Sequence, residues 1–195
     1  MNAKYALLVF TLLFSVTVSP RTSAAADRLP DLAMAQLSDL RIDNTVDGRR
    51  LLRFTTIIVN RGAGPFELHG KRASTLDPDM DVTQRIYNNT GGYRDILTNA
   101  AMYYAGDGHN HWHLRDLETY ELKRLDNGVK VGVGAKHGFC FTDNYQSNLS
   151  LPGAPQTAFY RTCGNDPSLL QTTMGLSVGW GASHRPGLDS GALVY

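Results

Sequence analysis

The sequence predicts an all-β protein, an antiparallel β-sandwich with long loops and little helix. Short runs rich in β-branched and aromatic residues recur along the chain, and residues that favour turns separate them. Segments with the apolar spacing of an amphipathic helix are scarce. Repeated short strands joined by such turns are typical of antiparallel sandwiches and barrels.

The first predicted strand covers residues 51–60 (LLRFTTIIVN), which are rich in Phe, Thr, Ile and Val. The turn residues 61–65 (RGAGP) end it, and a second strand resumes at 66–69. Residues 71–78 and 146–156 have turn-forming or polar sequences with prolines, so we expect loops there.

Two hairpins are predicted further along the chain. Residues 81–87 and 93–96 flank the turn sequence NNTGG, and residues 119–125 and 129–133 flank DNG. Asn-Gly tolerates positive φ, so the second hairpin has the strongest turn signal in the chain.

Composition excludes some classes of function. The chain has 195 residues, with 19 Lys+Arg against 18 Asp+Glu and a net charge of +1. This balance gives no electrostatic reason to expect nucleic acid or an anionic membrane surface as a partner. A hydrophobic content of 42% is typical of a globular protein, and the length suits a single domain.

The N-terminal segment predicts export. Lys4 precedes an apolar run at 5–18, and the small residues 24–26 (AAA) follow it. This order is typical of a secretory signal peptide, which we place at residues 1–26, with the mature domain at 27–195. A membrane anchor is the alternative, but a span needs about 20 apolar residues and this run is shorter. We therefore expect a secreted, periplasmic or extracellular protein with no integral membrane span after signal removal.

Cys140 and Cys163 are the two cysteines, and both follow the signal segment. An even count in an oxidising compartment favours one disulfide over a pair of buried free thiols. Closing a loop of about two dozen residues would stabilise the fold by roughly 3 kcal/mol in the chain-entropy estimate.

Three of the 6 histidines lie within five residues, at His109, His111 and His113. In a strand, alternate side chains point to the same face, whereas on a helix this spacing would spread the rings around the axis. Asp107 and Gly108 supply a turn just before the cluster. The pattern therefore predicts a metal site on a strand, and the alternative is a solvated histidine run.

The ligand type narrows the choice of metal. Three neutral imidazoles suit copper, zinc, nickel or iron and do not suit calcium or magnesium. The segment offers no thiolate, which argues against a structural zinc site of the finger type. The ligands alone leave copper, zinc and iron open.

Two further stretches accompany the cluster and extend the pattern. After residues 109–113 (HNHWH) come Asp116 and 120–122 (YEL), then 134–140 (GAKHGFC) and Asp143. This arrangement resembles the copper and lysine segments of the lysyl oxidase family. The stretches LPDL, LLRF and GLS elsewhere in the chain also resemble that family, so the likeness runs from about residue 29 to about residue 181.

The resemblance implies a copper-dependent oxidase of primary amines, which forms aldehydes with O₂ and releases ammonia and hydrogen peroxide. Family members carry a lysine tyrosylquinone, a cofactor made from a lysine cross-linked to an oxidised tyrosine, and this quinone performs the difficult chemistry. Lys136 matches the cofactor lysine. Asp116 matches a family aspartate and is the candidate proton acceptor or carboxylate behind the ligands.

Each of these residues also has a simpler interpretation. Lys136 fits an ordinary exposed lysine, which is the usual state of lysine in a glycine-rich stretch. Asp116 fits an exposed residue paired with Arg115 or Arg124. His137 is either a fourth ligand or a loop histidine, and we expect a loop histidine.

The sequence departs from the family at the cofactor tyrosine. His184 stands at that position, and a histidine cannot be oxidised to a quinone. Tyr160 and Tyr195 are possible substitutes, but no motif supports either, so the tyrosine partner is not identified. The family domain continues with further strands, and we expect those C-terminal strands to be missing here.

Three other functions compete with the amine oxidase. A non-catalytic secreted copper-binding sandwich follows from the loss of the tyrosine. A zinc or iron enzyme with three histidines fits the same ligands. A serine hydrolase with Ser177 in a Gly-x-Ser-x-Gly elbow needs a strand-to-helix turn, which the β-rich surroundings disfavour.

Overall fold

The computed structural model describes residues 25–44, 46, 48, 50–106, 110–184 and 192–194, with the side chains at 133, 135–137 and 192–194 left out of the description. Most of the predicted signal peptide, His109 and Tyr195 therefore lie outside the described residues. No helix occurs in the described part, and no segment of it forms a helix long and apolar enough to cross a bilayer.

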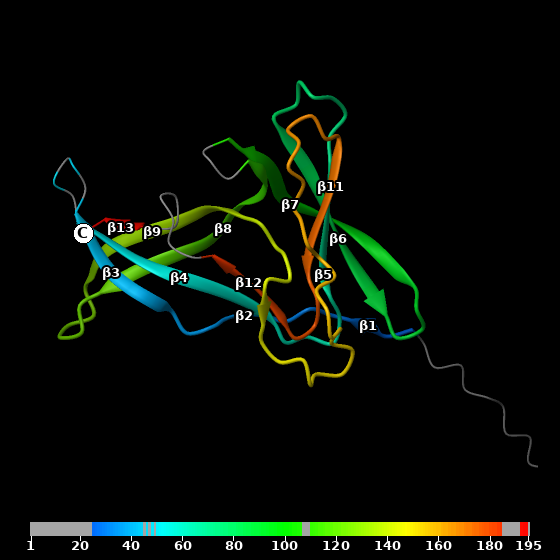
Figure 1. The fold of residues 1–195 in the computed structure, drawn as a ribbon, viewed down its shortest axis with the longest axis horizontal. Coiled ribbons are helices and arrows are strands. Elements are labelled where there is room, and N and C mark those ends of the chain that lie inside the picture. Colours follow the sequence, from blue (N-terminus) through cyan, green and yellow to red (C-terminus); the bar gives the residue numbers. More distant parts are fainter. Residues whose placement is uncertain are drawn as a thin grey trace, which may run out of the picture.

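The described chain is all-β, as predicted, with thirteen strands joined by turns and loops (Figure 1). The strands are β1 (Asp27–Arg28), β2 (Leu32–Met34), β3 (Ser38–Asn44), β4 (Arg50–Asn60), β5 (Phe66–Lys71), β6 (Asp79–Asn88), β7 (Tyr93–Ala105), β8 (His111–Lys123), β9 (Lys130–Phe139), β10 (Tyr145–Gln146), β11 (Gln171–Leu176), β12 (Trp180–His184) and β13 (Ala192–Val194).

All strand pairs are antiparallel, and they form two sheets that share β4. The longest path of neighbours is β10-β12-β4-β13-β9-β8-β7-β6-β5-β11. The β8–β9 pair runs across the view in Figure 1, at a steep angle to β5, β6 and β11. The predicted antiparallel sandwich with long loops is confirmed.

Both predicted hairpins are present and longer than expected. β6 and β7 pair from Asp79 to Tyr87, and β8 and β9 pair across the DNG turn, where Gly128 has a φ of 69°. That positive φ is the backbone conformation for which glycine is the favoured residue. The loops predicted at 71–78 and 146–156 contain no strand or helix beyond their first residues, since Lys71 ends β5 and Gln146 ends β10.

The hydrophobic core gathers side chains from both sheets and from the loop between β10 and β11. Alternation along the strands turns one face of each toward this core, because successive side chains point to opposite faces. Its fully buried members include Met80, Met102, Trp112, Phe139, Phe141, Met174 and Leu176.

A disulfide joins Cys140, just after β9, to Cys163 in that loop, with a Cα–Cα distance of 5.8 Å. The predicted pairing is confirmed. The loop is also attached to β8, because the Trp112 backbone N–H donates to Gly164 O at 3.1 Å and its indole N–H donates to Asp166 O at 3.0 Å. The loop thus covers the strand that carries the histidines.

Candidate metal centre

His111 and His113 lie at the start of β8, and their rings meet on one side of the strand. Their Nε2 atoms are 2.8 Å apart and their ring centroids 4.5 Å apart. Trp112 between them is fully buried in the core, as the alternation of a strand requires. The two Nε2 atoms are thus in hydrogen-bond contact, and both rings lie on the same side of the strand.

That spacing suits a transition metal. Nitrogen ligands lie about 2.0–2.1 Å from zinc, and two such ligands at an angle of 90–109° are about 2.9–3.4 Å apart. A separation of 2.8 Å between the Nε2 atoms needs only a small movement to reach this range. The imidazole donors fit copper, zinc, nickel or iron.

The third histidine of the predicted cluster, His109, lies outside the described residues. Within the described part of the chain, no group of three or more His, Cys, Asp or Glu side chains is arranged to hold a metal ion. The described chain thus contributes two of the three predicted ligands, His111 and His113.

His113 is almost completely buried, with 3% of its surface exposed, whereas His111 is partly exposed. Tyr103 of β7 lies opposite His113 in the ladder, and its ring packs edge-on against the imidazole at 5.7 Å. The Arg115 guanidinium lies over the Tyr103 ring, with its central carbon 4.5 Å from the ring centroid. These contacts hold the His113 ring in one orientation.

Gly138 of β9 completes the wall around His113. A Cβ at this position would lie 2.3 Å from His113 Nδ1 and 2.2 Å from the Tyr103 hydroxyl. Only glycine allows so close an approach of a strand to these two side chains. The glycine belongs to the GAKHGFC stretch, so this part of the sequence motif has a packing role.

Lys136 lies two residues before Gly138 on β9, and its Cα pairs with that of Glu118 on β8. The side chains of Lys136 and His137 lie outside the description, so the predicted roles of both residues stay predictions. A bulge between Arg115 and Glu118 separates the Lys136 position from His113 along the ladder.

Asp116 lies in this bulge, with a φ of 51° and an exposed side chain. Aspartate tolerates the left-handed region better than most residues, so it suits this position. The two arginines weighed as its partners bind other carboxylates, since Arg115 pairs with Asp79 at 2.7 Å and Arg124 with Asp126 at 2.6 Å. The exposure of Asp116 differs from what a carboxylate behind the ligands would show.

Glu118 is the buried carboxylate of this region, with 7% of its surface exposed, and sequence reasoning missed it. It accepts a hydrogen bond from the Tyr120 hydroxyl on the same strand. Burial first, and then the hydrogen bond to Glu118, raise the pKa of Tyr120 well above its ordinary value. The sequence did carry a signal for this pair, because residues two apart in a strand, such as Glu118 and Tyr120, point to the same face.

His184, at the position of the family tyrosine, ends β12 and pairs with Thr56 of β4. Its Nε2 lies 3.1 Å from Cys140 O, and its ring packs against Phe139 with centroids 4.0 Å apart. Tyr160, one suggested substitute, donates its hydroxyl hydrogen bond to Glu67 on β5. Tyr195, the other, lies outside the described residues.

Ser177, the alternative nucleophile, does not lie in an elbow between a strand and a helix. It follows β11, is 4% exposed, and leads through a turn into β12. Its hydroxyl donates to Asp143 Oδ2 at 2.6 Å and its N–H to Asp143 Oδ1 at 2.8 Å. Ser177 thus closes a buried turn, and the serine-hydrolase interpretation at this residue is wrong.

No protein-family model, curated protein or solved structure matches this chain. The likeness to the lysyl oxidase family accordingly depends on the sequence motifs alone.

Proposed function

We propose that this protein binds a copper ion through His109, His111 and His113 and that it turns over amines weakly or not at all. The observation that supports the proposal is the 2.8 Å separation of the His111 and His113 Nε2 atoms on one side of β8. Two neutral imidazoles that converge in this way are typical ligands of a transition metal. The resemblance of the HNHWH and GAKHGFC stretches to the family favours copper over zinc and iron.

The walls of the site support a metal held in a fixed geometry. Tyr103 and Gly138 fix the ring of His113, and the buried ring is shielded from water. A preformed pair of rings also lowers the entropy lost when the ion binds.

Copper titration of the purified chain, followed by elemental analysis, tests this proposal. We expect one copper per chain, with His111→Ala and His113→Ala each losing most of it and His137→Ala retaining it. Retention of copper by both single variants, or a preference for zinc or iron in protein purified without added metal, would overturn the proposal.

Amine oxidation is the second candidate function, and it depends on the quinone. In the family, the lysine tyrosylquinone supplies the chemistry that converts a primary amine to an aldehyde with O₂. In this chain Lys136 would supply the lysine, but His184 supplies no phenol and already has a structural role against Cys140 and Phe139. We therefore propose that the chain lacks this cofactor.

Quinone staining and peroxide release from benzylamine, both on copper-loaded protein, test the second point. We expect neither signal from the natural chain and both from His184→Tyr if that position alone lacks the phenol. Both signals from the natural chain would show that another tyrosine forms the quinone.

The disulfide supports export, because such bonds persist in oxidising compartments. We propose a secreted or periplasmic location on this ground together with the predicted signal peptide. A primary amine and O₂ remain proposed partners only for a chain that carries the quinone.

A further inference from the structure

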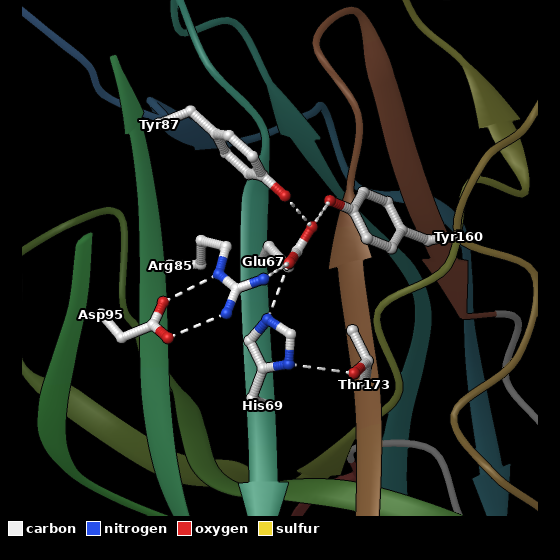
Figure 2. A network of polar contacts seen from close by, with 7 residues as sticks. All are labelled: Glu67, His69, Arg85, Tyr87, Asp95, Tyr160 and Thr173. Carbon is white, nitrogen blue, oxygen red and sulfur yellow. Dashed lines mark hydrogen bonds and ion pairs between the residues drawn. The ribbon is translucent and has the colours of Figure 1, made fainter. Parts of the chain in front are cut away.

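A second polar cluster lies around β5 and β11 (Figure 2). Glu67, His69 and Thr173 alternate with the buried core residues Leu68 and Met174, so they lie on the opposite face of these strands. Its centre is Glu67, a carboxylate with 5% of its surface exposed. Glu67 accepts hydrogen bonds from the Tyr87 hydroxyl at 3.0 Å and from the Tyr160 hydroxyl, and its Oε1 lies 2.7 Å from His69 Nε2. A buried carboxylate needs such partners, and here they occupy both of its oxygens.

Arg85 adds a positive charge to the cluster. Its Nη1 lies 3.8 Å from Glu67 Oε1, and its side chain forms two bonds of 2.8 Å with Asp95. The arginine is thus fixed by one carboxylate while it faces another. With its oxygens occupied, Glu67 serves to orient its neighbours, of which the His69 side chain is 29% exposed and that of Arg85 21%.

Gly175 shows that the backbone makes room for this arrangement. It pairs with Glu67 across the ladder, and a Cβ there would lie 2.9 Å from the ring of Tyr160. The absence of a side chain lets that ring lie over β11 and direct its hydroxyl at the carboxylate.

His69 uses both ring nitrogens. While Nε2 faces Glu67, Nδ1 lies 3.1 Å from the Thr173 hydroxyl oxygen. A neutral imidazole that donates its Nε2–H to the carboxylate has an acceptor at Nδ1, and the threonine hydroxyl donates to it. The result is a hydroxyl, an imidazole and a buried carboxylate in hydrogen-bonded sequence, the arrangement that activates a nucleophilic hydroxyl.

The strand register adds donors beside this trio. Thr173 pairs with His69, and two residues along the same strands Gln171 pairs with Lys71. The second pair is displaced by about 6.6–7 Å along the sheet and lies on the same face. All four residues line one pocket of about 710 Å³. Lys71 and Gln171 therefore line the same pocket as the Thr173 hydroxyl, as does Asp81, which pairs with Lys71 across the ladder.

We propose that Thr173 and His69 form a second active site, which transfers the acyl group of a carboxylic ester, with Glu67 as the positioning residue. His69 Nδ1 takes the hydroxyl proton as Thr173 Oγ1 bonds to the ester carbonyl carbon, and Glu67 stabilises the imidazolium. The ester C–O bond breaks, and the proton passes to the leaving alcohol. Water then attacks the acyl-threonine in the same way, which releases the acid and restores the hydroxyl.

This site is independent of the proposed copper centre, and the experiment keeps the two apart. Hydrolysis of p-nitrophenyl acetate is measured with the disulfide-bonded chain in the presence of a chelator, and again with His111→Ala. We expect the activity to persist in both. Loss of activity in both would assign the hydrolysis to a metal-bound hydroxide and overturn the proposal.

Variants of the trio test the mechanism. We expect Thr173→Val and His69→Gln to lose at least about 100-fold in kcat/KM, and Thr173→Ser to retain activity. Thr119→Val is the matched control, because it removes an exposed threonine on β8 outside the pocket. Mass spectrometry of the natural chain after rapid quenching provides a readout that needs no variant, and we expect the acetyl group on Thr173. Acetyl groups on lysines alone, or equal rates for Thr173→Val and Thr119→Val, would overturn the proposal.

Glu67→Gln tests the positioning role. We expect kcat to fall about tenfold or more and the midpoint of the pH–rate profile to move to lower pH, because the imidazolium loses its negative neighbour. A fall in rate with an unchanged pH profile, or with a collapsed thermal transition that Thr173→Ser does not share, would assign Glu67 to folding alone.

Discussion

Gly138 decides how closely β9 approaches His113, and its replacement should disturb the proposed metal site without removing a ligand. Gly138→Ala would place a methyl group 2.2–2.3 Å from Tyr103 and His113 atoms. We expect a loss of about 1–3 kcal/mol in the free energy of unfolding and about tenfold in copper affinity. Denaturant unfolding and copper titration measure the two effects.

Gly106→Ala is the matched control, because a Cβ there meets nothing within 4 Å and the residue has no positive φ. Equal stability and equal copper affinity for Gly138→Ala and Gly106→Ala would show that β9 does not constrain His113.

The buried hydroxyl of Tyr160 should make the free energy of unfolding depend on pH. Burial first, and then the hydrogen bond to Glu67, raise its pKa above the ordinary value. The unfolded chain ionises this hydroxyl near pH 10 while the folded chain keeps the proton. The resulting stability is present below about pH 10 and is lost as the pH rises above it.

Tyr160→Phe removes this contribution. We expect the variant to be less stable by about 1.5–3 kcal/mol at neutral pH, because the buried Glu67 loses a donor. We also expect its unfolding free energy to fall less steeply than that of the natural chain between about pH 10 and 11. Parallel pH curves for the two proteins would contradict the raised pKa.

At the scale of elements, the link between Cys140 and Cys163 holds the loop that covers β8. The bond closes a sequence separation of 23 residues. We expect Cys140→Ala/Cys163→Ala to lose about 3 kcal/mol and to lower Tm by about 6–12 °C. Calorimetry with and without reductant measures this. A double variant with the same Tm as the natural chain measured without reductant would contradict this expectation.

The strand pattern was predictable because β-branched runs and the DNG turn act locally. The pairing of Cys140 with Cys163 followed from there being two cysteines, and the shared face of His111 and His113 followed from alternation. The network of Glu67, His69 and Thr173 was not predictable, since β5 and β11 lie about a hundred residues apart and nothing local sets their register.

The bulge in β8 limited the prediction of the site in a similar way. It exposes Asp116 and leaves Glu118 as the buried carboxylate opposite the Lys136 position. Asp116 lies three residues after His113, so regular alternation already places it on the other face of β8, and the extra residue of the bulge makes Glu118 the residue that pairs with the Lys136 position.

At the scale of the whole molecule, one antiparallel framework carries two separate polar sites. The histidine pair lies on β8, between β7 and β9 in the middle of the strand order, and the Glu67 cluster lies on β5 and β11 at one end of that order. Because the sites share no residue, variants at one should leave the other intact. We therefore expect the proposed copper binding and the proposed ester hydrolysis to be lost separately.

Electron paramagnetic resonance of the chain loaded with one Cu(II) tests the central claim most directly, because nitrogen hyperfine structure reports imidazoles bound to the metal. We expect a spectrum with three equivalent or near-equivalent nitrogens, with fewer nitrogens in His111→Ala and in His113→Ala and the same number in His137→Ala. A spectrum without nitrogen coupling, or one unaffected by both His111→Ala and His113→Ala, would contradict it.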